Sequence, residues 1–297
     1  MTVLTTNNLT KHFGKVKALN GVDIEVREGE VFGFIGPNGA GKSTTLRILL
    51  GMLRATDGSA TIFEKDAWND AVKLHERIAY VPGDVNLWPN LTGGEVIDLF
   101  IKLRGGKRTE RRDELIRRFQ LDPTKKCRAY SKGNRQKVAL VAAFSSDADL
   151  YILDEPTSGL DPLMERVFQE CVNEVKQQGK SVLLSSHILS EVEKLCDRVA
   201  IIRDGRIIES GSLADLRHLT RTQLLVETKQ PMTELASQPG VHHVEEKGST
   251  VVFQVDSEKL DQVLSYISTF GIVKIESAPP TLEDLFMRHY EGVGGEG

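Results

Sequence analysis

The stretch from Gly36 to Thr44, GPNGAGKST, constrains the fold of this chain more than any other part of its sequence. It fits the pattern G-x-x-x-x-G-K-[ST] and stands between a short apolar run, Val31 to Ile35, and a helical pattern, Thr45 to Leu50. The sequence therefore predicts a buried strand, a glycine-rich loop and a helix in direct succession. Backbone N–H groups of such a loop converge on phosphate oxygens, and the helix N-terminus adds the positive end of its dipole. This arrangement predicts an α/β fold with a phosphate-binding site.

The loop itself is predicted to bind a nucleotide, because strand, loop and helix follow one another in the required order. The alternative is a glycine-rich turn that has no ligand. Lys42 would supply a full positive charge to the phosphates, and Ser43 would place its hydroxyl on Mg²⁺. The predicted nucleotide-binding residues of the loop are Gly36, Asn38, Gly39, Ala40, Gly41, Lys42, Ser43 and Thr44.

Length and composition indicate a soluble protein with more than one domain. The chain has 297 residues, which is long for one hydrophobic core and favours one large domain plus a smaller one. The longest apolar run, about Val138 to Phe144, is far below the ~18 residues that a membrane span needs. The N-terminus lacks the pattern of a secretory signal. The 3 cysteines lack metal-ligand spacing and are predicted to be reduced thiols in a cytosolic protein.

The charge of the chain argues against a general nucleic-acid binder, because the net charge is −4. Positive charge is nevertheless concentrated between Ile101 and Lys137, which contain 14 Lys and Arg against 4 Asp and Glu. This segment is either a solvated helical face or a surface that lies near an acidic partner or the anionic cytoplasmic leaflet. We favour the solvated face, since basic runs are commonly just solvated.

The N-terminal part of the chain predicts a half-exposed antiparallel sheet, with strands at Val3 to Thr6 and Gly21 to Val26. Phe13 lies between them, either as part of the core or as an exposed aromatic on which an adenine base stacks. Its loop-like neighbourhood favours stacking. From about Thr92 to Phe144 the pattern is helical, and Glu95 follows Thr92 at the spacing of a capping box.

Two carboxylates, Asp154 and Glu155, directly follow a strongly apolar run. The run predicts a central strand that presents Asp154 and Glu155 at its carboxyl end, where α/β sheets bind ligands. Asp154 would hold Mg²⁺ together with Ser43, and Glu155 would orient or polarise the water that attacks the γ-phosphate. A further strand, Ser181 to Ser185, ends just before His187, which is well placed to sense that phosphate. The alternatives are plain solvation for the acids and a structural role for the histidine.

The spaced motifs together resemble those of the ATP-binding cassette (ABC) family, specifically the nucleotide-binding subunit of an ABC transporter. The resemblance covers about residues 4–215 and implies a RecA-like P-loop NTPase core, an antiparallel β subdomain and a helical subdomain at about residues 84–145. The corresponding motifs are the Walker A element (Gly36 to Thr44), the Walker B element (Leu150 to Glu155), the signature (Tyr130 to Asn134), the D-loop (Ser158 to Asp161) and the switch histidine (His187).

The resemblance also implies how ATP is used. In this family two cassettes close head to tail, so that ATP on the Walker A loop of one is covered by the signature of the other. The signature residues that would contact ATP in this way are Ser131, Lys132, Gly133 and Asn134. Asp161 would link the two sites. Because the chain carries one cassette, it would pair with a second copy or with a related ATPase chain.

Two positions depart from the family pattern. The signature reads YSKGN instead of LSGGQ, so that Lys132 replaces a glycine and Asn134 a glutamine. Variants with lysine here resemble the exporter branch. The Q-loop position after Tyr80-Val81-Pro82 is Gly83, which brings no oxygen to Mg²⁺ or to the attacking water. Asp84, the next residue, is the candidate that could take over this contact.

The C-terminal part, residues 217–297, has a composition of its own, with 7 basic and 12 acidic residues. Its periodicity predicts the order βαββαβ, which is the ferredoxin-like arrangement, and a last helix after two prolines. The predicted elements are a strand at Gln223 to Thr228, a helix at Met232 to Ser237, a hairpin of Val241 to Glu246 and Val251 to Val255, a helix at Ser257 to Phe270, a strand at Ile272 to Ile275 and a helix at Thr281 to Tyr290.

We therefore predict an ABC ATPase domain at residues 1–216 and a C-terminal accessory α+β domain at residues 217–297. The tail resembles that of exporter-type cassettes of the ABC-2 type, including drug and antibiotic resistance pumps. It would bind a regulator, pack dimer partners or cap the dimer.

The predicted function is hydrolysis of ATP, with Mg²⁺ as cofactor, which drives the separate transmembrane permease subunits of an exporter. The chain would lie at the cytoplasmic face of the membrane and have no nucleic-acid partner. The main alternative is a soluble cassette ATPase that acts on ribosomes or DNA; such proteins usually carry two cassettes or a long coiled coil, and neither pattern is visible here. A catalytically weak cassette, suggested by Gly83, and an importer ATPase are further alternatives.

Overall fold

The structure is a computed structural model that describes residues 1–106, 109–218, 221–232, 234–248 and 250–278. It divides into two compact units, Met1–Ser210 and Gly211–Gly297, and each is described by itself. Among the described residues no helix is both long enough and apolar enough to cross a membrane.

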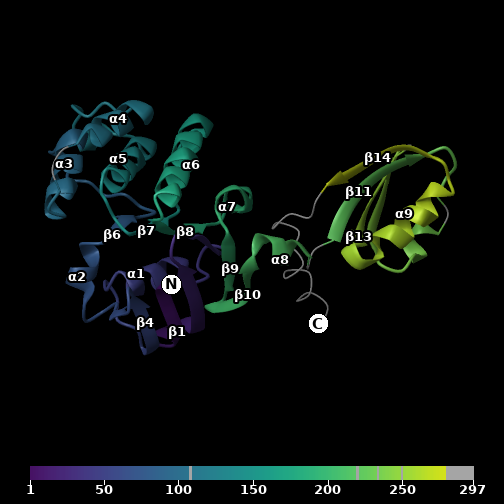
Figure 1. Ribbon diagram of the computed structural model, residues 1–297, viewed down its shortest axis with the longest axis horizontal. Helices are drawn as coiled ribbons and strands as arrows, with labels where there is room; N and C mark the ends of the chain where they lie inside the picture. Colours follow the sequence, from purple (N-terminus) through teal and green to yellow (C-terminus); the bar gives the residue numbers. More distant parts are fainter. Residues whose placement is uncertain (107–108, 219–220, 233, 249, 279–297) are drawn as a thin grey trace. The chain divides into compact units, whose positions relative to one another are not determined.

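The first unit alternates strands and helices after an antiparallel start (Figure 1). Its strands are β1 (Thr2–Phe13), β2 (Val16–Arg27), β3 (Val31–Ile35), β4 (Asp57–Ile62), β5 (Lys65–Asp66), β6 (Ile78–Val81), β7 (Leu150–Asp154), β8 (Ser181–Ser186), β9 (Arg198–Arg203) and β10 (Arg206–Ser212). Its helices are α1 (Lys42–Leu49), α2 (Ala71–His75), α3 (Gly93–Leu103), α4 (Glu110–Arg118), α5 (Lys132–Phe144), α6 (Pro162–Gln177) and α7 (Leu189–Leu195).

A six-stranded sheet with the order β10-β9-β3-β8-β7-β6 forms the centre of this unit. Five of its strands, β9, β3, β8, β7 and β6, run parallel to one another. Every residue of β3, β7 and β8 is buried, which explains their nearly continuous apolar sequences. The carboxyl ends of β3, β8, β7 and β6 therefore lie side by side, and the segments that follow them meet at one edge of the sheet.

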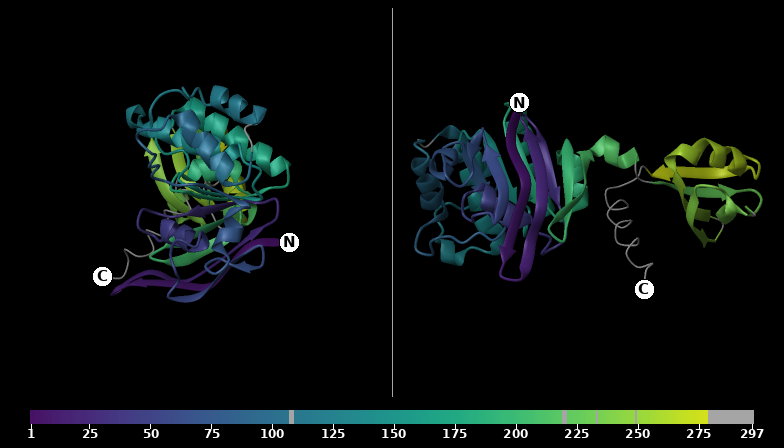
Figure 2. Two further views of the ribbon diagram at one scale, coloured as in Figure 1. Left: turned by 90° about the vertical axis from the view of Figure 1, so that its left-hand side faces the viewer. Right: turned by 90° about the horizontal axis from the view of Figure 1, so that it is seen from below.

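The second sheet of this unit is antiparallel and has the order β2-β1-β4-β5. The two predicted strands are confirmed as parts of β1 and β2, which are longer than expected and are drawn in purple in Figure 2. The loop-like setting expected for Phe13 is wrong, because Phe13 is the last residue of β1 and is paired with Val16 across a tight hairpin. Gly14, with a φ of 58°, makes this hairpin possible.

The segment between β6 and β7 is helical, as predicted, and contains α3, α4 and α5. The predicted capping box is confirmed: the Thr92 hydroxyl accepts a hydrogen bond from the Glu95 N–H at 3.2 Å, and the Glu95 carboxylate accepts one from the Thr92 N–H at 2.6 Å. Part of the basic run is neutralised inside the fold. Arg112 is buried against Asp98, and two arginines of α4, Arg111 and Arg118, form ion pairs with glutamates of α6. These residues join helices and do not form a free basic surface.

The second unit is a four-stranded antiparallel sheet with the order β12-β13-β11-β14, and α9 packs on one of its faces (Figure 2). Its elements are α8 (Leu213–His218), β11 (Arg221–Thr228), β12 (Val241–Lys247), β13 (Thr250–Asp256), α9 (Leu260–Ser268) and β14 (Ile272–Ala278), with 3-10 turns at Leu235–Ser237 and Ser257–Lys259. Its core contains Leu224, Val226, Leu235, Val241, Phe253, Val255, Val263 and Ile267.

The four predicted strands of this unit are confirmed, but the helix predicted at Met232 to Ser237 is wrong. The described residues show only a 3-10 turn at Leu235–Ser237. Glu234 has a left-handed backbone conformation, and Pro239 disfavours helix in the residue before it, so no α-helix continues on either side. The helix predicted at Thr281 to Tyr290 lies outside the described residues.

Candidate functional site

The glycine-rich loop follows β3 and leads directly into α1, with Gly41 at the N-cap. Gly41 has a φ of 115°, and a Cβ atom there would lie 2.7 Å from Leu19 Cδ2 and 2.9 Å from the Ala18 carbonyl oxygen. A Cβ atom on Gly36 would lie 2.3 Å from the carbonyl oxygen of Ile202. The glycines at these positions are therefore required by close packing of the backbone as well as by the open shape of a phosphate cradle.

Lys42 is folded back over this loop and is 4% exposed. Its ammonium group donates hydrogen bonds to the carbonyl oxygens of Gly36 at 2.6 Å and Pro37 at 3.2 Å. The same group lies 3.6 Å from Glu155 Oε1. Burial lowers the pKa of Lys42, while the carboxylates of Glu155 and Asp154 act in the opposite direction. The loop thus holds a buried cation that already has one carboxylate partner.

Asp154 and Glu155 lie at the end of β7 in two different environments. Asp154 is 6% exposed, and its Oδ1 accepts a hydrogen bond from the Ser185 hydroxyl at 2.5 Å. Glu155 has a φ of 45°, which turns its side chain away from the strand direction and toward Lys42. Its backbone N–H donates to the Ser185 carbonyl oxygen at 3.0 Å. The two acids are therefore adjacent in the chain, but the carboxylate of Asp154 contacts Ser185, whereas that of Glu155 faces Lys42.

His187 follows β8 and lies beside Glu155, with 3.4 Å between His187 Nδ1 and Glu155 Oε1. One carboxylate oxygen therefore contacts both the lysine of the glycine-rich loop and the histidine of the next strand. Two carboxyl-terminal strand ends and one loop-to-helix junction bring these three side chains together, in the place where the sequence predicted a site.

Three supporting residues were missed by the sequence analysis. Ser185 contacts both Asp154 and the Glu155 backbone, as described above. Ser186 donates to the buried carboxyl group of Glu191 at 2.9 Å and accepts from the Ile188 N–H, which fixes the start of the His187 segment. Burial raises the pKa of Glu191. Polar residues at the end of an otherwise apolar strand were the signal that could have identified the two serines.

Gly83 follows β6 and lies next to Asp154. A Cβ atom on Gly83 would be 3.2 Å from the Asp154 carbonyl oxygen and 3.6 Å from its Oδ2. The predicted Q-loop position is thus at the site, but it has no side chain. Asp84 is exposed and accepts a hydrogen bond from the Asn86 amide at 3.3 Å.

The predicted signature residues contact the D-loop of the same chain. Ser131 is the N-cap of α5 and accepts a hydrogen bond from the Asn134 N–H at 3.3 Å. The Lys132 ammonium donates to the Ser158 hydroxyl at 2.7 Å. A Cβ atom on Gly133 would lie 2.3 Å from the Gly159 carbonyl oxygen. The signature and the D-loop therefore form one continuous contact.

Asp161 and Phe13 have settings that the sequence did not define. Asp161 is the N-cap of α6, and its carboxylate accepts hydrogen bonds from the N–H groups of Leu163 at 3.1 Å and Met164 at 3.0 Å. Phe13 is 49% exposed at the end of the β1–β2 hairpin. The same hairpin brings Ala18 against the glycine-rich loop, so Phe13 belongs to a structure that borders the site.

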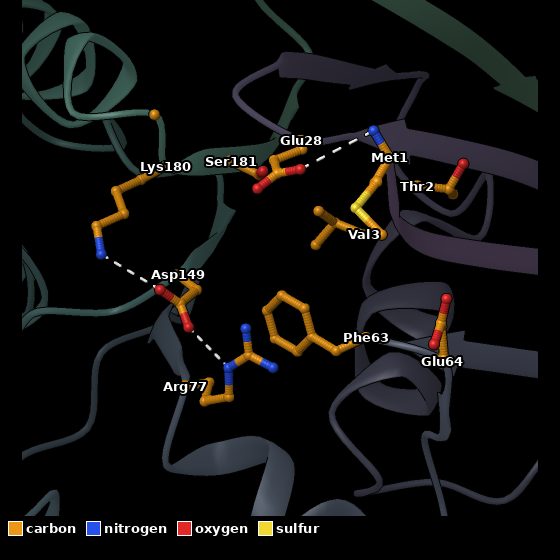
Figure 3. Close-up of a pocket in the computed structure, with 11 residues that line it drawn as sticks. Met1, Thr2, Val3, Glu28, Phe63, Glu64, Arg77, Asp149, Lys180 and Ser181 are labelled. Carbon is orange, nitrogen blue, oxygen red and sulfur yellow. Dashed lines mark hydrogen bonds and ion pairs between the residues drawn. The ribbon is translucent and has the colours of Figure 1, made fainter.

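A pocket of about 260 Å³ lies at the opposite edge of the parallel sheet, near the amino ends of its strands (Figure 3). Three of the charged side chains in it are paired: Arg77 stacks on the Phe63 ring and forms an ion pair with Asp149, which also contacts Lys180. These contacts join the antiparallel sheet to the parallel sheet. We assign them a structural role.

The fold and the loop define a class of protein, the P-loop nucleoside triphosphatases, because a buried strand, GPNGAGKST and a helix N-terminus follow one another at the carboxyl edge of a parallel sheet. Sequence patterns narrow this class. The pattern of the ABC transporter family matches residues 19–158, and that of the "ATP-binding protein DrrA1-3-like, C-terminal domain" matches residues 211–290.

Known proteins agree with these matches. The uncharacterized ABC transporter ATP-binding protein YhaQ of Bacillus subtilis (strain 168) is 32% identical over 96% of this chain and 97% of that relative. The bacitracin transport ATP-binding protein BcrA of Bacillus licheniformis is 28% identical over 97% of this chain and 97% of that relative. A dimeric post-hydrolysis state of the ATP-binding cassette MJ0796, bound to ADP and Pi, has a TM-score of 0.64 and 25% identity over 71% of this chain and 98% of that chain.

The chain belongs to the ABC transporter family, as one of its ATP-binding proteins. Its first unit has the ABC ATPase cassette fold, a RecA-like core with an antiparallel β subdomain and a helical subdomain, and its second is a β-rich C-terminal domain. It is an ATPase whose hydrolysis of ATP is coupled to transport. ABC cassettes dimerise and pair with the membrane subunits of a transporter.

Proposed function

We propose that this chain hydrolyses MgATP at sites shared between two cassettes arranged head to tail, and that it thereby drives separate membrane subunits of an exporter. The observation that carries this proposal is the convergence of Lys42 and His187 on one oxygen of Glu155, at 3.6 Å and 3.4 Å. A carboxylate in this position can orient or polarise an attacking water, while the lysine binds the phosphates. His187 reports the presence of the γ-phosphate to Glu155.

Mg²⁺ fits the oxygen groups beside the loop. This ion is usually bound by one or two carboxylates together with substrate phosphates and waters. Asp154 offers a nearly buried carboxylate of which Oδ1 is engaged by Ser185, and its Oδ2 faces the space beside Gly83. Together with the Ser43 hydroxyl it would hold the ion. The chemistry that the ion would supply there is neutralisation of the charge that develops on the phosphates during hydrolysis.

Asp84 is the residue that we propose supplies the oxygen which Gly83 lacks. It is one position further along the chain, so its Cα is about 3.8 Å from that of Gly83. Asp84→Ala is expected to weaken the apparent Mg²⁺ affinity of ATP turnover by about 10- to 100-fold, the usual effect of removing a group that supports a metal. The measurement is a Mg²⁺ titration of phosphate release. Asn86→Ala, which removes the hydrogen-bond partner of Asp84, is the control. An unchanged Mg²⁺ dependence for Asp84→Ala would mean that the site lacks this contact.

The contacts of the signature support the head-to-tail arrangement. Among the described residues its side-chain hydrogen bonds lead to its own helix, to the Asp122 carbonyl oxygen and to Ser158, and none joins it to Lys42 or Glu155. We infer that Ser131 and Gly133 complete the site of a second cassette instead. The partner is a second copy or a related chain.

The membrane subunit has a suitable docking place between residues 80–87 and helices α3 and α5. A cavity of about 180 Å³ is lined there by apolar side chains, among them Val85, Leu87 and Phe100. Arg104 also lines it, and burial lowers the pKa of this residue. Its only hydrogen-bond partner among the described side chains is the Ser146 hydroxyl, at 2.6 Å. A segment with an apolar side chain and a carboxylate would fill the cavity and pair with the arginine.

Phe100→Asp is expected to release the membrane subunit, because the new carboxylate would be buried against an apolar partner. The tagged chain is purified from native membranes in mild detergent, with and without ATP, and the associated proteins are identified. We expect a polytopic membrane protein in stable ratio with the parental chain, and a loss of about 30-fold or more with the variant, corresponding to a contact of about 2 kcal/mol.

Leu103→Asp is the matched control, since Leu103 lies on the same helix, is exposed and does not line the cavity. Equal recovery of the membrane protein with both variants would reject this docking place. Co-purification with ribosomes or DNA-repair proteins would instead support the alternative, a soluble cassette ATPase.

The exporter assignment and its cargo rest on the C-terminal unit and on similarity. The DrrA1-3-like pattern covers this unit, and BcrA, named for bacitracin transport, aligns along nearly the whole chain. We propose that the cargo is a drug or an antibiotic-like molecule.

We also assign the C-terminal unit to the ferredoxin-like arrangement. Counted in chain order, its strands lie in the spatial order of second, third, first and fourth, and the first helix is reduced to a turn.

A further inference from the structure

The sheet of the C-terminal unit has two edge strands of different character. The last three residues of β12, Glu245 to Lys247, are charged. Its pairing with β13 shifts between His242 and Glu245, and His243 has a φ of 49°. Charges and bulges of this kind protect an edge against pairing. On β14, by contrast, Val273 is 58% and Ile275 is 43% exposed. Within the described residues β14 has one neighbouring strand, β11.

The exposed side chain of Ile275 lies on the face of the sheet against which α9 packs. Ile275 is paired with Val226, and Val226 belongs to the core beneath α9. Side chains of directly paired residues lie on the same face of a sheet. Ile275 is nevertheless outside that core. The helix that was expected before β12 is a short turn, and α9 does not cover the outer strand.

We propose that β14 pairs antiparallel with β14 of a second copy of this chain, with Ile275 of each copy on the two-fold axis. The two four-stranded sheets would then form one continuous sheet. From Lys274 to Ala278 the register with β11 is unbroken, so this part of the edge is a regular strand that can accept a partner. Ile275 would pack against its own copy.

The charges of β14 select this register. Lys274 and Glu276 lie on the face opposite Ile275 and form an ion pair with each other along the strand at 2.7 Å. With Ile275 on the axis, Lys274 of one copy lies opposite Glu276 of the other, and the reverse. A two-fold axis at Lys274 or at Glu276 would place identical charges directly opposite each other, which is unfavourable. The strand is therefore complementary to itself in one register.

Disulfide cross-linking of the full-length chain without nucleotide tests the pairing. Residues on the axis of an antiparallel pair have Cα atoms about 4.5–5.5 Å apart, which a disulfide can bridge. Ile275→Cys is expected to give a covalent dimer on mild oxidation. Ser277→Cys is the matched control on the same face of the strand, because in this register its own copy is about 13 Å away. The native cysteines, Cys127, Cys171 and Cys196, are buried, and the parental chain should stay monomeric on a non-reducing gel.

Charge exchange in the Ile275→Cys background gives the second readout. Lys274→Glu or Glu276→Lys alone is expected to abolish the covalent dimer, and the two together are expected to restore it. Three results would overturn the proposal: equal cross-linking of the Ile275→Cys and Ser277→Cys chains, no dimer from the Ile275→Cys chain, or no rescue by the double exchange. Cross-linking that appears only after removal of residues 279–297 would show that this segment covers the edge, and would also overturn it.

Discussion

Glu155→Gln is expected to reduce ATP turnover by about 10²- to 10⁴-fold while the chain still binds ATP, because glutamine keeps the shape of the side chain but cannot accept a proton. Lys42 and His187, which both contact the Glu155 carboxylate, would remain in place. Since ATP would then persist in the closed state, the variant should accumulate as an ATP-bound dimer. Phosphate release and light scattering in MgATP measure the two effects.

Glu64→Gln provides the control for this substitution. Glu64 is an exposed glutamate that lines the pocket at the other edge of the parallel sheet (Figure 3), so the same chemical change there should leave turnover at the parental rate. A Glu155→Gln chain that hydrolysed ATP as fast as the parent would reject the role assigned to Glu155. A chain that lost turnover but did not dimerise in ATP would retain that role and reject the head-to-tail arrangement.

Lys42→Ala is expected to weaken ATP binding strongly and to reduce hydrolysis. The lysine is buried against the loop, and its replacement would leave the phosphates without their only full charge from this loop, at a cost of about 2–5 kcal/mol. The affinity for ATP should therefore fall by about 30- to 4,000-fold. Calorimetric titration with ATP measures this change. Lys73→Ala, an exposed lysine on α2, is the control.

A thermal unfolding curve separates the loss of binding from a loss of folding, because Lys42 is also a buried cation that pairs with Glu155. The pH dependence of ATP affinity offers a second measurement. Burial lowers the pKa of Lys42, and the charged form binds phosphate, so affinity should fall with rising pH below the range in which an ordinary lysine titrates. The fall should be absent in Lys42→Ala. ATP binding by Lys42→Ala with parental affinity would mean that the loop does not need this charge.

Much of this site could be predicted from the sequence because its parts are local patterns. The glycine-rich loop, the acids after an apolar run and a histidine after the next strand each sit at the carboxyl end of a predicted strand. Parallel strands place these ends at one edge, and the structure shows Lys42, Glu155 and His187 in contact there. The ABC family followed from the order of the motifs and is confirmed by the family matches.

The remainder depends on contacts between segments that are distant in the sequence. No pattern indicates that Gly83 lies against Asp154, or that Gly133 lies against Gly159, because such contacts arise only when the sheet and the helical segment pack together. The expected setting of Phe13 was wrong because a glycine was interpreted as a loop when it closes a hairpin. The expected helix before β12 was wrong because its apolar spacing did not reveal the backbone turn at Glu234.

The left-handed backbone conformation of Glu155 lowers the folding stability at the residue to which we assign catalysis. Such a conformation costs a residue with a Cβ atom about 1–3 kcal/mol, and glycine or asparagine adopts it more cheaply. Anyone who ranks substitutions at this position by folding free energy would therefore choose a residue without a carboxylate. Selection of a variant library for thermal stability would enrich the same kind of residue. With the catalytic role that we propose for Glu155, selection for stability at position 155 would reduce ATP hydrolysis, and this position should be held fixed in any redesign of this cassette.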